Sequence, residues 1–252
     1  MEQILSVTYS NDESLKSISK IFLKGEPFEL DPTYSKGVFY KNFPKPKYKS
    51  DLIPQDKDIL KMDCRELNFE SSSIKSIIFD PPFLFRNQKS NNNDKMCVRF
   101  SYFKNFKELL NMYESSLKEF YRVLEKNGIL AFKCQDMTGG SGSRPFFNTH
   151  SKIIEMAEEK GFVLKDIQIL VTKRKIIRKA KEQGCFRKVH SYFLIFKKQK
   201  KHNYKDSGFN DSENTVFTEN NNQQESNGGR SLTSNNTSSP ADTSYFNEET
   251  KK

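Results

Sequence analysis

The sequence S-I-I-F-D-P-P-F, residues 76–83, joins a short apolar run to an acidic residue and two prolines. The apolar run is typical of a buried parallel strand, which delivers Asp80 to its carboxyl end. In an open α/β sheet, ligands bind in the crevice outside the carboxyl ends of the strands. Two consecutive prolines have fixed φ and no N–H, so the backbone after Asp80 is stiff and its carbonyls are available as acceptors. The stretch therefore predicts a rigid acidic corner at the ligand-binding edge of a sheet.

Such a corner suits the exocyclic amine of a nucleobase. The Asp80 carboxylate and the Pro81 carbonyl form a pair of acceptors, and Phe83 offers a flat apolar surface beside them. Two acceptors would take both hydrogens of the amine and direct its lone pair at an electrophile, while the base stacks on the aromatic ring. The alternative is a strand-ending turn without a function, which is common for this composition. The flanking sequence has to decide between the two.

The four residues Asp80, Pro81, Pro82 and Phe83 resemble the D-P-P-[YFW] motif of the amino-methyltransferases, which use S-adenosylmethionine to methylate an exocyclic base nitrogen. The resemblance implies that these four residues are catalytic. It also implies an α/β, Rossmann-like class I methyltransferase fold with a mostly parallel central sheet and an antiparallel terminal strand. Aspartate rather than serine before the prolines favours adenine over cytosine as the target.

The segment 27–40 is similar to the cofactor turn of this family, [VL]-L-D-P-F-x-G-x-G. A short strand at 28–30 leads into three matching residues, Asp31, Pro32 and Gly37. The middle glycine is replaced by Ser35 or is absent. Glycines in such a turn let a ligand approach the backbone closely, and the resemblance makes the three matching residues candidate cofactor contacts.

Two further strand ends supply acidic residues. A second strand within residues 45–54 is expected to end at Asp51, and an acidic side chain there accepts hydrogen bonds from ribose hydroxyls in doubly wound nucleotide sites. A third strand is expected to end at Asp63, and the resemblance places Asp63 and Cys64 beside the adenine of the cofactor. The connection between the first two strands is too short for a full crossover helix, which needs a dozen or more residues.

The second half of the chain supports the same family. Residues 106–128 predict the clearest helix, with apolar residues at i, i+3, i+4 and i+7 and a left-handed stop at Asn127-Gly128. A buried strand at 129–136 follows it, and this helix and strand resemble the segment after the catalytic motif throughout the family. Further elements are expected at residues 151–160 (helix), 162–171 and 189–196 (two strands, one of them antiparallel).

Charge indicates a polyanionic partner. Residues 1–200 hold 37 basic and 24 acidic residues, within a chain of formal net charge +10. Basic residues alternate with aromatics in residues 84–105 and are dense in residues 172–188, where they would contact phosphates. The alternative is a solvated charged surface. The candidate nucleic-acid-binding residues are Arg86, Lys89, Arg99, Lys173, Arg174, Lys175, Arg178, Lys179, Arg187 and Lys188.

Composition divides the chain into three parts. We expect an N-terminal arm or short helix at residues 1–25, a methyltransferase domain at 26–200 and a disordered tail at 201–252, because the tail has too few apolar residues to offset its ordering entropy. The four cysteines are more than 30 residues apart, which matches no zinc site or disulfide framework, and no metal is expected. A signal segment and long apolar runs are absent from the sequence, which predicts a soluble cytoplasmic protein without membrane contact.

The sequence therefore predicts a DNA methyltransferase that uses S-adenosylmethionine and modifies the exocyclic amine of adenine, or that of cytosine. Two alternatives stay open: an RNA methyltransferase of the same fold, and an inactive nucleic-acid-binding protein, which the incomplete glycine turn would favour. The sequence makes no prediction of oligomeric state.

Overall fold

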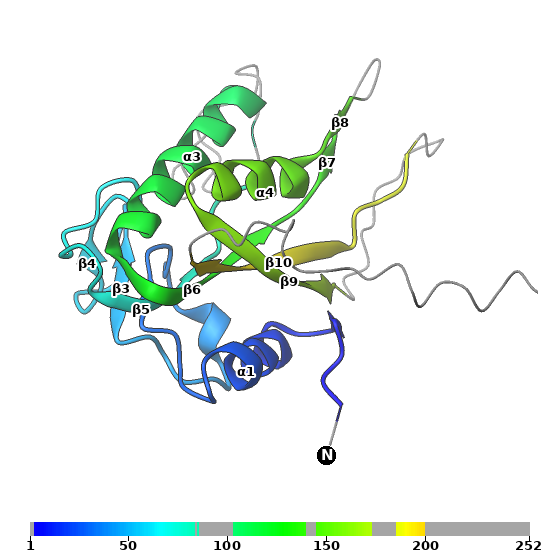
Figure 1. Ribbon diagram of the computed structural model, residues 1–252. Coiled ribbons are helices and arrows are strands. Elements are labelled where there is room, and N and C mark those ends of the chain that lie inside the picture. The colour runs from blue at the N-terminus through cyan, green and yellow to red at the C-terminus, as the bar shows by residue number, and fades with distance from the viewer. Residues whose placement is uncertain (1–2, 84, 86–102, 140–144, 173–184, 200–252) are drawn as a thin grey trace, which may run out of the picture. The chain divides into compact units, whose positions relative to one another are not determined.

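Figure 1 shows the computed structural model, which describes residues 3–83, 85, 103–139, 145–172 and 185–199. Residues Met1–Asn203 form one unit, to which the following description applies. The second unit, Tyr204–Lys252, lies outside the described residues, and so does the tail predicted at 201–252.

An eight-stranded sheet organises the first unit, in the order β1-β9-β10-β6-β5-β2-β3-β4. Neighbouring strands are parallel, except that β10 runs antiparallel to both β6 and β9. This mostly parallel sheet with one antiparallel strand confirms the predicted fold class. The strands are β1 (Val7–Thr8), β2 (Leu30–Asp31), β3 (Tyr48–Asp51), β4 (Leu60–Lys61), β5 (Ile74–Phe79), β6 (Leu124–Cys134), β9 (Phe162–Val171) and β10 (His190–Lys198).

The strand order fixes where a ligand site can lie. From the β4 edge inward, the strands β4, β3, β2, β5 and β6 follow the doubly wound order 3-2-1-4-5. The order reverses between β2 and β5, and ligands of such sheets bind outside the carboxyl ends of the strands at this switch point. Asp80 directly follows β5, so the predicted corner stands at the switch point.

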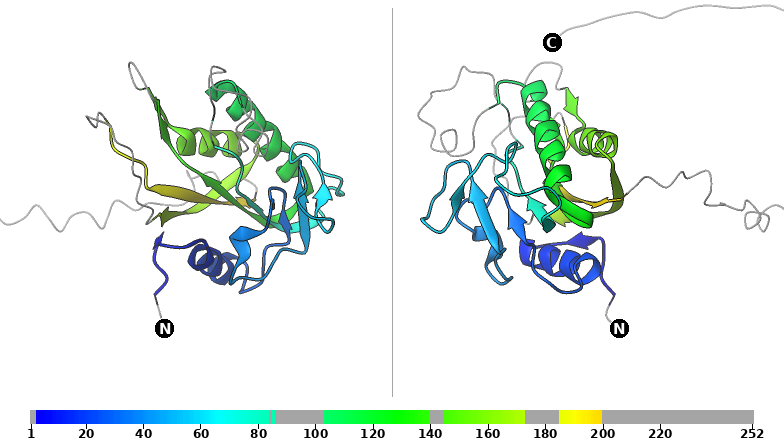
Figure 2. Two further views of the ribbon diagram at one scale, coloured as in Figure 1. Left: turned by 180° about the vertical axis from the view of Figure 1, so that it is seen from behind. Right: turned by 60° about the vertical axis from the view of Figure 1, so that its left-hand side comes forward.

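Helices cover both faces of the sheet. Helix α1 (Asn11–Phe22) lies on one face, and α3 (Phe106–Val123) and α4 (Thr149–Glu159) lie on the other (Figures 1 and 2). Two separate cores result: Leu15 and Ile18 of α1 are buried on one side of the sheet, and Leu117 and Phe120 of α3 on the other. None of the helices in the described part of the chain is long and apolar enough to cross a membrane.

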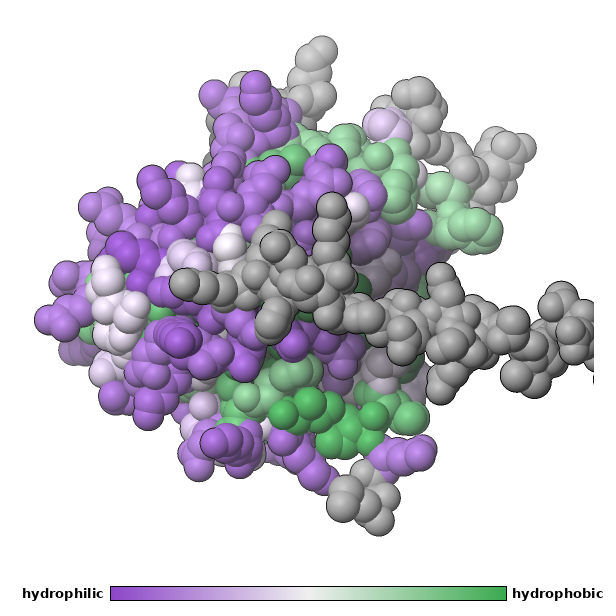
Figure 3. Space-filling model, viewed as in Figure 1, coloured by the Kyte–Doolittle hydropathy of each residue, from purple (hydrophilic) through white to green (hydrophobic). Residues whose placement is uncertain are grey.

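The N-terminal residues are part of the sheet unit. Strand β1 pairs with β9 at the sheet edge, and Ser10 caps α1 by accepting a hydrogen bond from the backbone of Glu13. The face seen in Figure 3 is mostly hydrophilic, with a hydrophobic patch in the region of α1. Leu5, before β1, and Ile21 of α1 are exposed apolar side chains. We expected an arm or short helix here; the structure has a helix and an edge strand.

The connections agree with the sequence in some places and differ in others. Only a short 3-10 helix, η1 (Val38–Tyr40), lies between β2 and β3, which confirms the shortened crossover. The strand expected at 28–30 is β2, at Leu30–Asp31, and β4 ends two residues before Asp63. After β6, a hairpin of β7 (Met137–Thr138) and β8 (Phe146–Phe147) precedes α4.

The predicted helix at 106–128 was too long. Helix α3 ends at Val123, because Leu124 already pairs with Ile74 of β5. The pairing register shifts before the next paired residues, Ser76 and Ile129, so the pairing of the two strands is irregular between these points. Asn127, with φ of 69°, belongs to this irregular stretch of β6 and not to a helix cap.

Candidate active site

Thr33 joins the carboxyl ends of β2 and β5. Its backbone N–H and its hydroxyl both donate to Asp31 Oδ1, at 2.8 and 3.1 Å, and the same hydroxyl accepts a hydrogen bond of 3.0 Å from the Asp80 N–H. The predicted cofactor turn and the D-P-P-F corner are therefore one hydrogen-bonded unit.

Lys133 forms an ion pair with Asp80. Phe79 and Phe132 are register partners in the parallel strands β5 and β6, so the next residues, Asp80 and Lys133, emerge side by side. Lys133 Nζ lies 3.1 Å from Asp80 Oδ2, and the two side chains are 12% and 30% exposed. The contact fixes the position of the Asp80 side chain at the corner.

The corner is also held from the side of α3. The hydroxyl of Tyr113, a fully buried residue, donates a hydrogen bond of 2.8 Å to the Pro82 carbonyl. Pro81 is buried, whereas Pro82 and Phe83 are half-buried. The Pro81 carbonyl as an acceptor for a base amine stays a prediction.

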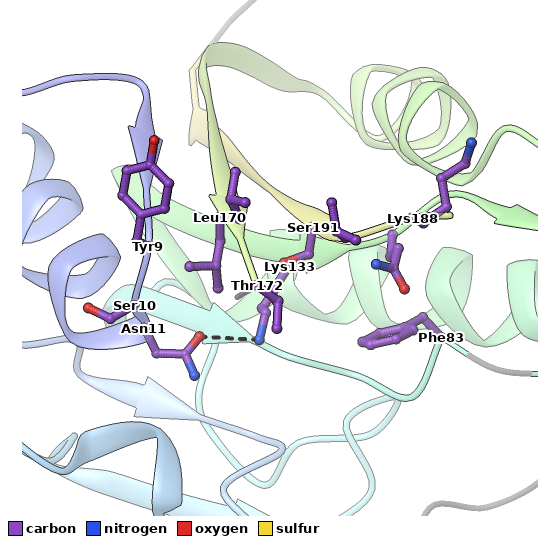
Figure 4. A pocket seen from close by; sticks show the side chains of 12 residues that line it. Tyr9, Ser10, Asn11, Phe83, Lys133, Leu170, Thr172, Lys188 and Ser191 are labelled. Carbon is purple, nitrogen blue, oxygen red and sulfur yellow. Dashed lines mark hydrogen bonds between the residues drawn. The ribbon is translucent and has the colours of Figure 1, made fainter. Parts of the chain in front are cut away.

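A cavity of about 480 Å³ opens next to this corner (Figure 4). Figure 4 shows Phe83 and Lys188 at one end, Tyr9 and Ser10 at the other, and Lys133 between them. The walls come from the carboxyl ends of β6 and β9, the start of β10 and the start of α1. The lining residues are Tyr9, Ser10, Asn11, Phe83, Lys133, Gln135, Leu170, Val171, Thr172, Lys188, Val189 and Ser191.

The predicted cofactor turn has the backbone of a glycine-rich turn. Ser35 and Gly37 both have left-handed φ angles, 51° and 65°, although an ordinary side chain disfavours this conformation. Ser35 thus stands where the family motif has its middle glycine. A side chain at Gly37 would collide with the ring of Tyr34, so this position needs glycine on two grounds.

Asp31 faces the interior and not the cavity. It is 3% exposed, and its second oxygen accepts a hydrogen bond of 2.7 Å from the Tyr40 hydroxyl. Burial raises the pKa of the Asp31 carboxyl to about 7, although the hydrogen bonds from Tyr40 and Thr33 act in the opposite direction. With both oxygens engaged inside the protein, Asp31 holds the turn together; its predicted direct contact with a cofactor is not supported by these bonds.

This buried carboxyl predicts a pH-dependent stability. The pKa of Asp31 is about 7 in the folded protein and 3.8 in the reference state that stands for the unfolded chain. The stability that this protonated carboxyl contributes to the fold is therefore complete below pH 3.8 and is lost as the pH rises through 7. We expect the stability difference between wild type and Asp31→Asn to fall by about 2–4 kcal/mol from pH 4 to pH 8. Urea unfolding at both pH values measures this difference. Asp166→Asn, at an exposed position of β9, is the control for the effect of losing an aspartate at the surface. An unchanged difference would contradict the prediction.

The other predicted cofactor residues lie at the ends of β3 and β4. Asp51 is half-buried and accepts hydrogen bonds from the backbone N–H groups of Ser35 (2.9 Å) and Ile53 (2.8 Å). Hydrogen bonds from Arg65 lower the pKa of Asp63 and occupy both its oxygens.

Cys64 points toward α3. Its Sγ lies 3.3 Å from the hydroxyl of Ser116, and burial raises the pKa of the thiol to about 11. None of Asp31, Gly37, Asp51, Asp63 and Cys64 lines the cavity next to Phe83. Among the described residues, no three His, Cys, Asp or Glu side chains gather in an arrangement that could hold a metal ion.

A sequence profile decides the family. The profile of the N6/N4 DNA methylases, described as DNA methylase, matches residues 74–252. The chain belongs to this family. The match starts at the first residue of β5 and includes the D-P-P-F corner, whereas the cofactor turn and strands β2 to β4 precede it. No curated protein matches the chain significantly in sequence.

Several solved structures resemble this methylase-family chain. The putative DNA modification methylase TTHA0409 of Thermus thermophilus, complexed with S-adenosyl-L-methionine, is 17% identical over 56% of this chain and 54% of its own, with a TM-score of 0.41. The cytosine-N4-specific PvuII DNA methyltransferase is 19% identical over 54% and 47%, with a TM-score of 0.41. A putative methyltransferase complexed with the Haloferax volcanii Trm112 activator is 13% identical over 75% and 92%, with a TM-score of 0.43.

The chain spans about half the length of the first of these structures. All three TM-scores are below 0.5, so these structures do not establish the fold. The fold follows from the strand order of the chain and from the sequence profile.

Two of the predicted nucleic-acid-binding residues, Arg187 and Lys188, are described in this methylase-family chain. Lys188 lines the cavity, and its Nζ lies 5.0 Å from the ring centre of Phe146 in β8. The others lie outside the described residues: Arg86, Lys89, Arg99, Lys173, Arg174, Lys175, Arg178 and Lys179.

Sequence reasoning did not assign three residues that hold the corner, namely Thr33, Tyr113 and Lys133. Only Lys133 left a local signal, because it is a charged residue within the apolar run of β6. Thr33 lies inside the cofactor motif, and Tyr113 has the pattern of an ordinary core position on α3.

Proposed function

We propose that this chain is a DNA methyltransferase that transfers a methyl group from S-adenosylmethionine to the exocyclic amine of a base, with adenine as the preferred target. The observation that carries the proposal is the Asp80–Lys133 ion pair at the switch point of the sheet. It stands next to a cavity lined by Phe83, in a chain of the DNA methylase family.

The cofactor that the family implies suits the residues at the ends of β2 and β3. The left-handed Ser35 and Gly37 give the turn the backbone of a glycine-rich turn, and the half-buried Asp51 carboxylate would accept the ribose hydroxyls. Asp31 would support this turn from inside through Thr33. When bound, S-adenosylmethionine supplies the electrophilic methyl group.

The D-P-P-F residues would seat the base. The Asp80 carboxylate accepts a hydrogen bond from the amine, and the ring of Phe83 at the end of the cavity stacks on the base. In duplex DNA the base must leave the stack, at a cost of about a few kcal/mol, which the stacking contact partly offsets. Arg187 and Lys188 would contact the phosphates near the cavity.

A second candidate function is nucleic-acid binding without methyl transfer. It is favoured by the start of the family match at residue 74 and by the position of the Tyr34 ring against Gly37, in the turn that would receive the cofactor. Cofactor binding separates the two candidates.

The test is methyl transfer from radiolabelled S-adenosylmethionine to duplex DNA, single-stranded DNA and RNA. We expect label in DNA and N6-methyladenine among the digested nucleosides by mass spectrometry. Label only in RNA would replace the DNA substrate by RNA. Transfer to no nucleic acid, together with no heat on titration of the cofactor in a calorimeter, would overturn the enzyme assignment and support the binding protein.

A further inference from the structure

We propose that Lys133 determines which bases the site accepts, by donating a hydrogen bond to the ring nitrogen next to the target amine. The proposal rests on the proposed function, because it concerns the base that enters the same cavity. Lys133 and Asp80 would act together as one donor and one acceptor that meet a single edge of the base.

The contacts of Lys133 hold its ammonium in place. Its Nζ donates to Asp80 Oδ2 at 3.1 Å. It also donates to Asn11 Oδ1, at the start of α1, at 3.5 Å (Figure 4). The rings of Phe39 and Phe193 lie 4.8 and 5.7 Å from the nitrogen. Lysine is almost never buried unless it is paired, and here a carboxylate, an amide oxygen and two aromatic faces surround a side chain that is 12% exposed.

The ammonium of Lys133 also has an N–H group that can donate a hydrogen bond to a ligand. A lysine ammonium carries three N–H groups, and the hydrogen bonds found among the described residues use two of them. Lys133 lines the cavity. A base that places its amine on Asp80 therefore brings the neighbouring ring atom toward Lys133 Nζ, because the two protein atoms are only 3.1 Å apart.

The chemistry of the bases shows which of them fit. In adenine and in cytosine, the carbon that carries the amine is bonded to a ring nitrogen with a free lone pair, N1 in adenine and N3 in cytosine. The amine would donate to Asp80 while this nitrogen accepts from Lys133. Thymine and uracil have no amine, and guanine presents such an edge only on the side of its sugar. The pair therefore selects adenine and cytosine as a class, and the rest of the cavity chooses between them.

A deaza-base series tests this directly. Duplexes carrying adenine, 1-deazaadenine or 7-deazaadenine at the target position are compared for wild type, Lys133→Met and Lys133→Arg. Wild type is expected to lose about 10- to 100-fold in kcat/KM on 1-deazaadenine, the effect of one hydrogen bond to a charged group, and to change little on 7-deazaadenine. Lys133→Met should be slower than wild type on adenine. Relative to its own rate on adenine, it should lose no more on 1-deazaadenine than on 7-deazaadenine.

Lys133→Arg keeps the positive charge and should retain part of the preference for adenine over 1-deazaadenine. Thermal unfolding of both variants checks that they fold. If the modified base is cytosine, 3-deazacytosine takes the place of 1-deazaadenine. Equal rates of wild type on adenine and 1-deazaadenine, or a preference that persists in Lys133→Met, would overturn the role of Lys133.

A binding experiment tests the role of Lys133 even if the chain is not a methyltransferase. If wild type transfers no methyl group to any base, fluorescence anisotropy with the same bases in single-stranded oligonucleotides measures the preference without catalysis. Wild type should then bind adenine more tightly than 1-deazaadenine, and Lys133→Met should not distinguish them. Equal binding by wild type would reject Lys133 as a base-reading residue whether or not the chain is an enzyme.

Discussion

Replacing Asp80 with alanine is expected to lower the rate of methyl transfer by about 10²- to 10³-fold, the loss typical for one preorganised polar group at a reacting atom. The carboxylate is held in place before any base arrives, by Lys133 on Oδ2 and by the bond from its own N–H to the Thr33 hydroxyl. Alanine would remove the acceptor that orients the amine. Single-turnover methylation of a DNA duplex measures the effect on the chemical step.

Two further variants distinguish chemistry from folding. Asp80→Asn keeps the shape and one acceptor oxygen but loses the charge, so it should fall between wild type and Asp80→Ala. Asp166→Ala removes an exposed aspartate from β9, far in sequence from the corner, and should stay within about twofold of wild type because exposed surface changes are usually small. Urea unfolding shows whether the variants are folded. A folded Asp80→Ala protein that keeps more than a tenth of the activity would contradict a catalytic role for Asp80.

The sequence predicted strands β9 and β5 of the sheet because residues that break strands mark their ends: Gly161 precedes β9, and the two prolines of D-P-P-F follow β5 closely. Strand β9 was expected at 162–171 and is found there, and β5 ends directly before Asp80, as expected. The predicted end of α3 was wrong because the local sequence pattern carries no information on the contact that ends the helix. The pairing of Leu124 with Ile74, fifty residues earlier, ends the helix and starts β6.

The sequence also did not predict in which direction the side chains at the strand ends point. The motif identified Asp31, but its carboxylate turns inward to the hydroxyl of Tyr40, a partner that the motif does not include. The partners of Lys133 were not predicted, because Asp80 and Asn11 lie 53 and 122 residues away in the sequence. Contacts of this kind follow from the strand order, and only the assembled sheet reveals them.

Replacing Phe132 with alanine is expected to give the largest loss of stability of any change considered for this chain, about 3–5 kcal/mol in the free energy of unfolding. Phe132 is fully buried, and its ring meets the rings of Phe79 and Tyr113 edge-on, with centroids 4.9 and 5.2 Å apart. A domain of this size is usually stable by only about 5–15 kcal/mol, so this loss would be a large fraction of the whole stability. Urea denaturation of the variant and of wild type measures it.

The same variant tests how the D-P-P-F corner is supported. Phe79 and Phe132 are register partners and directly precede Asp80 and Lys133, so the aromatic pair lies in the strands just before the ion pair. Phe132→Leu keeps most of the volume and should cost less than half as much as Phe132→Ala, whereas Phe146→Ala, at a ring 55% exposed, should stay within about 0.5 kcal/mol of wild type. A loss below about 1 kcal/mol for Phe132→Ala would be too small for a buried aromatic ring. The corner would then depend on its contacts with Thr33, Tyr113 and Lys133, and not on the packing of the Phe79 and Phe132 rings.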